Sequence, residues 1–171
     1  PIAYILKART TILRDMGAAM SPFNAFMFIQ GLETLALRMR EHSSNAEKVA
    51  EYLSNHESVE RVGYPSKMDG YAKERANKYL TKGNGALMGF EIKGGVEAGK
   101  KFIDALEMVY HVANIGDSRS LAIHPASTTH SQLNEEELLS AGVTPGYVRL
   151  SIGLEHVDDI IADIEHALAK I

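Results

Sequence analysis

The feature that most constrains the fold is a change in hydrophobic period along the chain. From residue 21 to residue 54, apolar side chains recur about every 3.6 positions, which predicts a long helix. Beyond it, short apolar runs alternate with amphipathic helical stretches, and strands are expected at 59–62, 86–92, 108–112, 121–123 and 147–152. Short strands separated by helices in one core favour an α/β (α+β) fold, with a small sheet and helices mainly on one face.

The expected helices carry start and stop signals. Ser21-Pro22 predicts a helix start, because Ser is a favoured N-cap and Pro is tolerated at the first helical position. The period then continues unbroken to Ser54. Asn134 and Glu137 have the spacing of a capping box, and that helix is expected to end at Gly142. Further helices are expected at 71–80, 98–106 and 157–171.

The composition narrows the class of protein. With 171 residues, of which 45% are hydrophobic, the chain can bury one substantial core. A net charge of −4 without a basic stripe argues against a nucleic-acid partner. No apolar run approaches the roughly 20 residues that span a bilayer, so no membrane partner is expected. The absence of Cys excludes thiolate catalysis and thiolate metal sites, and it fits a reducing, cytoplasmic compartment.

The amino-terminal residues resemble a cut edge. Pro1 stands where an initiator Met would, and the apolar residues from Ile2 to Leu13 arrive without turn residues. Phe23 to Ile29 are apolar nearly all round the first helical turns, so we expect a second domain or subunit to cover them. Upstream sequence is therefore expected to be missing, and the uncovered patch is expected to favour self-association.

Arg149 is the most informative single residue. Period-two geometry in Tyr147–Ile152 directs Val148 and Leu150 to one face of a strand, and Arg149 with Ser151 to the other. A guanidinium fixed on a strand is suited to bidentate recognition of a carboxylate. The alternative is an arginine on the solvated face of a sheet, and the residues alone favour that alternative.

The loop Ala113–Ser120 is dense in hydrogen-bonding groups between two expected strands. Binding residues concentrate on loops of a rigid scaffold, and Asn114 could offer its amide N–H to an oxygen ligand. The alternative is an Asx-turn in which Asn114 satisfies its own backbone. The residues alone favour the turn.

Two other segments contain chemistry-bearing side chains without a supporting pattern. His124 and His130 could bind a metal, but no third ligand has a suitable spacing, so no metal site is expected. Ser127 with His130 could suggest nucleophilic catalysis, yet no spacing rule supports it, and a loop tied down by hydroxyls is favoured. Lys82 superficially resembles a Schiff-base lysine, although its place at the polar end of a charged helix favours a contact with that helix end.

Five phrases of the sequence resemble the Cys/Met-metabolism pyridoxal-phosphate enzymes, in that family's order and spacing. The phrases are Leu13–Ala25, Gln30–Leu35, Asn114–Asp117, His124–His130 and Val148–Glu155. Within the family, Asn-Ile-Gly-Asp at 114–117 resembles the O-acetylhomoserine sulfhydrylases, whereas the cystathionine lyases and methionine γ-lyase tend to have Ser-x-Gly-Gly there.

The resemblance implies the carboxy-terminal domain of an aspartate-aminotransferase-like (fold type I) enzyme. Residues 1–20 would connect it to a missing amino-terminal cofactor domain, and residues 21–171 would form the small domain. The Schiff-base lysine is implied to lie upstream, so no catalytic or cofactor-binding residue is expected in this chain. Arg149 matches the family's arginine that binds the substrate α-carboxylate, and Asn114 matches the position that assists it. The resemblance thus reverses the interpretation from the residues alone.

The implied reaction is a γ-replacement that uses pyridoxal 5'-phosphate in the complete enzyme. Acetate leaves the γ-carbon of O-acetylhomoserine, and sulfide or a thiol adds to give homocysteine or methionine. The isolated chain is expected to bind no cofactor and to be inactive, and a homo-oligomer is expected. The alternatives are a cystathionine-type lyase, an O-succinylhomoserine sulfhydrylase, or a stand-alone non-catalytic α/β binding domain.

Overall fold

The computed structural model describes residues 2–171 and divides into two compact units, one ending at Ala36 and the other spanning Leu37–Ile171. Pro1, which prompted the expectation of a cut edge, lies outside the described residues. The expected division into 1–20 and 21–171 stays a prediction.

The first unit is helical. It contains α1 (Ala3–Lys7), a π-helical segment (Ala8–Met16) and α2 (Pro22–Glu33). Gly17, at φ +62°, ends the π-helical segment in the left-handed conformation that glycine adopts without strain. The Ser21 hydroxyl accepts a hydrogen bond from the Asn24 amide at 3.2 Å, with Pro22 in the first turn, which confirms the predicted helix start.

The prediction of one unbroken helix to Ser54 was wrong. The chain leaves helical geometry at Thr34 (φ −103°, ψ 2°), and a second helix, α3 (Leu35–Ser54), follows. Gly31 and Thr34 are both weak helix formers, and they lie where α2 ends. The apolar period does not register this break, because the period depends on which residues are apolar rather than on their backbone preferences.

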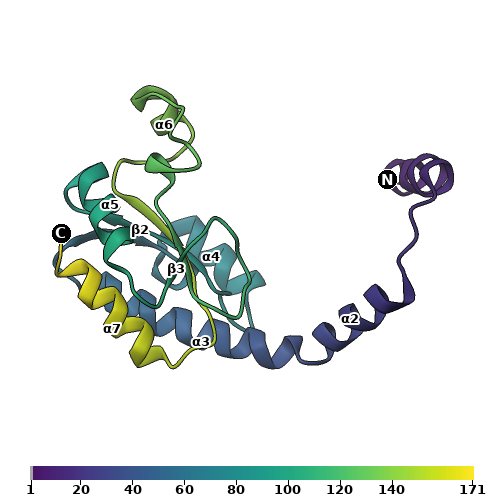
Figure 1. Cartoon of the computed structure of the whole chain (residues 1–171), viewed down its shortest axis with the longest axis horizontal. Helices are drawn as coiled ribbons and strands as arrows, with labels where there is room; N and C mark the ends of the chain where they lie inside the picture. The colour runs from purple at the N-terminus through teal and green to yellow at the C-terminus, as the bar shows by residue number, and fades with distance from the viewer. Residues whose placement is uncertain (1) are drawn as a thin grey trace. The chain divides into compact units, whose positions relative to one another are not determined.

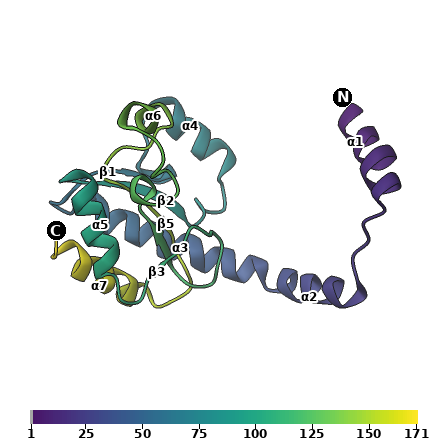
Figure 2. The same ribbon diagram turned by 45° about the horizontal axis from the view of Figure 1, so that its top comes forward.

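The second unit contains a five-stranded sheet (Figures 1 and 2). Its strands lie in the order β1-β2-β5-β4-β3, so β5 is the central strand. The β3–β4 pair is parallel and the other pairs are antiparallel. The strands span Val59–Gly63 (β1), Leu87–Ile92 (β2), Tyr110–His111 (β3), Leu121–Ile123 (β4) and Tyr147–Ser151 (β5).

Three helices cover the core face of this sheet: α3, α5 (Gly95–Ala105) and α7 (Val157–Leu168). Their buried side chains join Phe90, Val148 and Leu150 of the central strands in one cluster. Figures 1 and 2 show α3 and α7 on one side of the sheet, with the short α6 (Glu135–Ser140) projecting on the other. The predicted small sheet with helices mainly on one face is confirmed.

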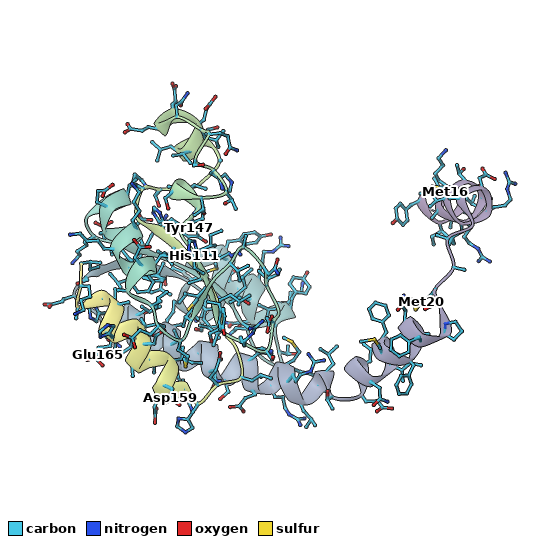
Figure 3. The ribbon with its side chains drawn as sticks, viewed as in Figure 1. Met16, Met20, His111, Tyr147, Asp159 and Glu165 are labelled. Atoms are coloured by element: carbon cyan, nitrogen blue, oxygen red, sulfur yellow. The ribbon has the colours of Figure 1, made fainter. Side chains whose placement is uncertain are left out.

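The outer face of α7 is polar, as its sequence period predicts. Asp159 and Glu165 are exposed there (Figure 3), whereas Ile160 and Ile164 are fully buried. Asp163 is the exception, because it is an acidic residue on the buried side. Its carboxylate accepts hydrogen bonds from the amides of Glu107, Met108 and Val109 at 2.8, 3.0 and 2.9 Å.

The Asp163 contacts explain why β3 is shorter than predicted. The sequence predicts a strand over 108–112, but only Tyr110 and His111 pair with β4. The amides of Met108 and Val109 donate to the helix side chain instead of to a neighbouring strand. A backbone donor has one hydrogen, so a donor used by Asp163 is not available for the sheet.

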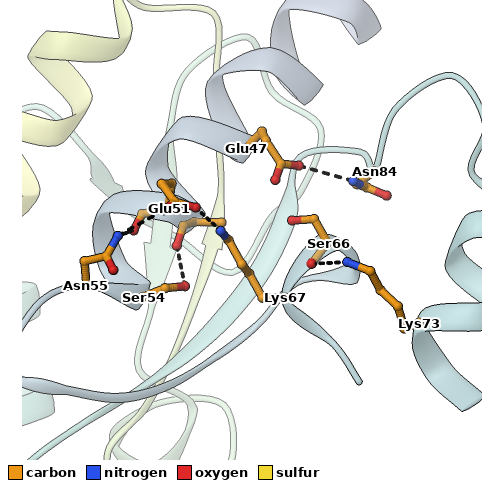
Figure 4. Close-up of polar contacts among 9 residues, drawn as sticks. Glu47, Glu51, Ser54, Asn55, Ser66, Lys67, Lys73 and Asn84 are labelled. Carbon is orange, nitrogen blue, oxygen red and sulfur yellow. Dashed lines mark hydrogen bonds and ion pairs between the residues drawn. The ribbon is translucent and has the colours of Figure 1, made fainter. Parts of the chain in front are cut away.

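Polar contacts attach the outer side of α3 to the segment that joins β1 and β2 (Figure 4). Asn84 donates to Glu47 at 3.2 Å, and Lys67 forms an ion pair with Glu51. This joining segment contains a short 3-10 turn (Pro65–Lys67) and α4 (Gly70–Tyr79), close to the predicted helix at 71–80.

The capping box of α6 is also confirmed, since Asn134 accepts from the Glu137 amide at 3.0 Å and its own amide donates to Glu137 at 2.9 Å.

The apolar side chains of the first unit are largely exposed in this chain. Phe23 is 68% exposed and Phe28 is 62% exposed, and Met16 and Met20 also stand out from the ribbon (Figure 3). The described residues of this unit therefore do not bury the apolar surface for which the sequence predicts a covering domain or subunit. Over residues 2–171, no helix is both long enough and apolar enough to cross a membrane.

Candidate functional site

The central strand β5 presents Arg149 on the face of the sheet opposite the core. Val148 and Leu150 have no exposed surface, whereas Arg149 between them is half-buried. Arg149 pairs in register with Gly89 of β2 on one side and Ile123 of β4 on the other. The predicted alternation of β5 is confirmed, and the guanidinium stem is fixed by a strand that has a partner on both sides.

The guanidinium of Arg149 is held by the loop that follows β3. Its Nη2 donates to the backbone oxygens of Ala113 at 2.8 Å and Asn114 at 3.2 Å. Its Nε is buried, and neither Nε nor Nη1 has a hydrogen-bond partner among residues 2–171. A buried donor without a partner costs free energy, so this side chain is incompletely satisfied by the chain itself.

Arg149 and residues 113–117 line one open pocket of about 470 Å³. The structure therefore brings together Arg149 and Asn114, the two residues that the sequence singles out for substrate binding. The Asn114 side chain makes no hydrogen bond to the described residues, while its backbone carbonyl contacts the guanidinium. A cationic group with free donors at an open, partly polar pocket is suited to an anionic ligand group such as a carboxylate.

The far half of the 113–120 loop is anchored by the segment that follows β5. The Ser120 amide and hydroxyl donate to the Glu155 carboxylate at 2.7 and 2.9 Å, and the Gly153 amide donates to the Ser120 hydroxyl at 2.9 Å. The Leu154 amide donates to the Ser118 oxygen at 2.8 Å. A Cβ on Gly153 would lie 2.5 Å from that oxygen, so the close approach of the two segments requires glycine.

Asp117 forms the local turn in this loop. Its carboxylate accepts from the Arg119 amide at 3.0 Å, which is the Asx-turn pattern, and its side chain also pairs with the Arg119 guanidinium at 3.4 Å. The backbone hydrogen bond from Arg119 is the main cause that lowers the pKa of Asp117 below its ordinary value. Arg119 in turn lies 4.5 Å from the ring centre of Tyr110. Arg119 is therefore engaged by Asp117 and Tyr110, and the positively charged residue that lines the pocket is Arg149.

Tyr147 covers β2 beside the site. A Cβ on Gly89 would lie 2.1 Å from the Tyr147 hydroxyl, so the ring occupies the space above that glycine. Figure 3 labels Tyr147 on this part of the sheet. Gly89 pairs in register with Arg149, and its lack of a side chain therefore admits the ring next to the arginine.

The segment His124–His130 is structural. His124 is fully buried, its Nε2–H donates to the Pro145 carbonyl at 2.8 Å, and its Nδ1 lies 2.8 Å from the Ser127 hydroxyl oxygen. Because a carbonyl only accepts, Nε2 carries a proton, and burial lowers the pKa of His124, which favours the neutral ring in which Nδ1 accepts from Ser127. The Ser127 hydroxyl is thus bonded to His124, whereas the His130 ring contacts the Thr129 hydroxyl. Within residues 2–171, no group of His, Asp and Glu side chains is arranged to hold a metal ion.

The lysines of residues 2–171 do not have the surroundings that a Schiff-base lysine needs. Every lysine in the described part is exposed or half-buried, and none lines the pocket of Arg149. Lys82 is exposed after α4. A lysine that carries an aldehyde cofactor needs a lowered pKa from burial or nearby cations. The residues of this chain therefore do not fit covalent attachment of such a cofactor.

The sequence interpretation missed the residues that hold the loop. Ser151, Ser120 and Glu155 connect the 113–120 loop to the segment after β5. Period two placed Ser151 on the face of Arg149, which is the one available signal. The other two contacts join residues 35 positions apart, and nothing local in the sequence indicates them.

Comparison with known proteins points to one class. Residues 3–169 match the family "Cys/Met metabolism PLP-dependent enzyme". An O-acetyl-L-homoserine sulfhydrylase of Leptospira meyeri is 60% identical over 171 residues, which are 99% of this chain and 39% of that protein. An L-methionine gamma-lyase of Fusobacterium nucleatum subsp. polymorphum is 46% identical over 160 residues, or 93% of this chain and 40% of that protein.

A solved structure gives the same result. The crystal structure of a putative O-acetylhomoserine (thiol)-lyase from Campylobacter jejuni, with N'-pyridoxyl-lysine-5'-monophosphate, superposes with a TM-score of 0.85 and 46% sequence identity. The match covers 96% of this chain and 39% of that one. The chain therefore spans about two fifths of the length of these relatives.

Proposed function

Because the chain belongs to the Cys/Met metabolism PLP-dependent enzyme family, we propose that it is the carboxy-terminal substrate-binding part of an O-acetylhomoserine sulfhydrylase. The complete enzyme would replace the acetate of O-acetylhomoserine by sulfide or a thiol, which gives homocysteine or methionine. The 60% identical relative supports the sulfhydrylase branch. The observation that carries the proposal is Arg149, which lines a pocket with residues 113–117 and whose Nη1 has no hydrogen-bond partner among the described residues.

In this proposal Arg149 binds the α-carboxylate of the amino-acid substrate. Its Nη1 makes no hydrogen bond to the described residues, so a carboxylate in the pocket would supply an acceptor for this nitrogen. Two backbone carbonyls hold Nη2, which limits the directions in which the fork can point. A fixed guanidinium orients the bound amino acid as well as attracting it, and orientation lowers the barrier to reaction.

Asn114 would assist in two ways. Its backbone oxygen holds the guanidinium at 3.2 Å, and its side chain has hydrogen-bonding groups that no described residue uses. The side-chain amide could therefore donate to the same carboxylate. We treat residues 1–20 as the connection to a cofactor domain and residues 21–171 as the small domain, and a homo-oligomer in a cytoplasmic, reducing environment remains part of the proposal.

The cofactor would be held outside this chain. Pyridoxal phosphate, when bound, supplies an electron sink for carbanions of the substrate. The exposed lysines of this chain do not fit its attachment, so the contribution of these residues is confined to binding and orienting the substrate carboxylate. The isolated chain would accordingly show no sulfhydrylase activity.

Replacement of Arg149 in the complete enzyme tests the proposal. Arg149→Ala should raise the KM for O-acetylhomoserine strongly and cost roughly 2–4 kcal/mol of transition-state binding in kcat/KM. Arg149→Lys should recover part of the loss, because it restores the charge but not the planar fork. An unchanged KM in an enzyme with a normal cofactor absorption spectrum would contradict the assignment.

The lyase alternative has a specific observation in its favour, since the methionine gamma-lyase relative is 46% identical. Assays of the complete protein would compare O-acetylhomoserine plus sulfide with O-succinylhomoserine plus sulfide and with methionine alone. Preferred turnover of methionine would favour the lyase, and preferred turnover of the acetyl ester would support the sulfhydrylase.

A further inference from the structure

We infer that Ser151 is a positioning residue for the substrate carboxylate, acting through the 113–120 loop on Arg149. The inference rests on the proposed function, because it concerns the carboxylate that Arg149 would bind. Ser151 lies two residues after Arg149 on β5 and faces the same side of the sheet. Its side chain carries no charge and is only 3% exposed, so it does not contact the bulk solvent of the pocket.

Ser151 contacts the 113–120 loop. The Ser151 hydroxyl oxygen accepts a hydrogen bond from the Gly116 amide at 3.1 Å. Gly116 has φ +77°, a left-handed conformation in which other residues are strained. The loop therefore turns at Gly116, and the turn is attached to the central strand of the sheet.

The loop in turn contacts the guanidinium of Arg149. The carbonyls of Ala113 and Asn114, just before the turn, hold Arg149 Nη2 at 2.8 and 3.2 Å. The two ends of this segment are held by backbone hydrogen bonds, from the Val112 amide to β4 and from the Leu154 amide to the Ser118 carbonyl. Between these ends, among the described residues, the Gly116 amide is the one main-chain donor that bonds to another element of the fold. Ser151 thus fixes the part of the loop that orients the guanidinium.

Arg149 and Ser151 belong to the same strand, so their separation is set by the extended backbone and does not vary with the loop. The strand holds the guanidinium stem at one point and the turn of the loop at another. Among the described residues, loss of the Ser151 acceptor would leave the two hydrogen bonds to Arg149 as the ones that join the backbone of residues 113–117 to the sheet.

The test is made in the complete enzyme with its cofactor. Ser151→Ala should raise the KM for O-acetylhomoserine roughly 3- to 10-fold, while kcat per active site stays within roughly two-fold. Ser151→Thr keeps the hydroxyl and should restore the KM. Ser54→Ala is the matched control, because the Ser54 hydroxyl bonds within its own helix to Ala50 at 2.7 Å and does not line the pocket of Arg149.

A second measurement separates positioning from a merely structural role. L-Homoserine and 3-aminopropan-1-ol, its counterpart without the carboxylate, are titrated into each variant and followed by the cofactor absorption. Ser151→Ala should weaken homoserine by the same factor as the KM and leave the amine unchanged. If the alanine variant does not fold, Ser151→Cys gives the same comparison with a weaker acceptor.

The variants distinguish a failure of the Ser151 role from a failure of the Arg149 role. Equal weakening of homoserine and the amine, or an unchanged KM, would overturn the role of Ser151. If Arg149→Ala also fails to weaken homoserine relative to the amine, the proposed function of Arg149 is at fault. If Arg149→Ala does so and Ser151→Ala does not, only the inference on Ser151 falls.

Discussion

Asp163 provides a sharp test of what holds the second unit together. Its carboxylate lies on the buried side of α7 and accepts three backbone hydrogen bonds from residues 107–109, where the chain enters β3. β3 leads directly into the loop that carries Asn114. Replacement of Asp163 by alanine would leave three amides without an acceptor, and the Val109 amide would be left unpaired in the core.

The expected loss in unfolding free energy follows from the exposure of these amides. An unsatisfied buried donor costs about 1–3 kcal/mol, and a lost bond to a donor that water can reach costs about 0.5–1.5 kcal/mol. The Val109 amide is buried and the other two contacts are half-buried, so Asp163→Ala should cost about 2–6 kcal/mol. Asp163→Asn keeps one acceptor oxygen and should cost about half as much.

Urea unfolding of the 171-residue chain at pH 7, followed by circular dichroism, measures both changes. Asp159→Ala is the matched control, because Asp159 is an exposed acidic residue in the first turn of the same helix. It should cost only about 0.3–1 kcal/mol through the helix dipole. If the cost of Asp163→Ala equals that of Asp159→Ala, the three hydrogen bonds do not carry the stability argued for them.

Two further predictions concern pH and the cofactor. Burial lowers the pKa of His124 in the folded chain, so the unfolded chain binds that proton at a higher pH. Stability at this site should be complete above the unfolded value of about 6.5 and should fall as the pH drops below it. Urea midpoints between pH 7.5 and 5.5 should show this fall, which His124→Gln should reduce; an equal fall in both proteins would refute it. Incubation of the chain with pyridoxal phosphate, followed by reduction with borohydride, should not label a single lysine or give a stable absorption band. Mass spectrometry would detect such a label. One uniquely labelled lysine would disprove the proposal that the Schiff-base lysine lies outside this chain.

Local patterns predicted most of the fold. The faces of β5, the start of α2 at Ser21 and the capping box at Asn134 depend on residues within a few positions of one another, and each was confirmed. The sequence did not predict features that depend on a residue far away in the chain. The length of β3 is set by Asp163, which is 54 positions from Val109, and no local pattern reveals that competition.

The candidate site divides in the same way. Arg149 could be placed on the face opposite the core from period two, and the family resemblance paired it with Asn114. The contact itself, a backbone carbonyl of Asn114 on the guanidinium, could not be foreseen, because every residue has a carbonyl and only the fold brings this one near. The same holds for the bonds of Ser120 to Glu155.

The anchoring of the 113–120 loop has a consequence for how such a pocket can evolve. Its supports are backbone groups and the side chains of Ser151, Ser120 and Glu155, whereas Ile115 is 60% exposed and lines the pocket without supporting the loop. Substitutions at 115 can therefore alter the shape and polarity of the pocket wall at little cost to folding. The backbone carbonyls of the loop and the strand β5 together hold Arg149, whereas the side chain at 115 shapes only the wall of the pocket.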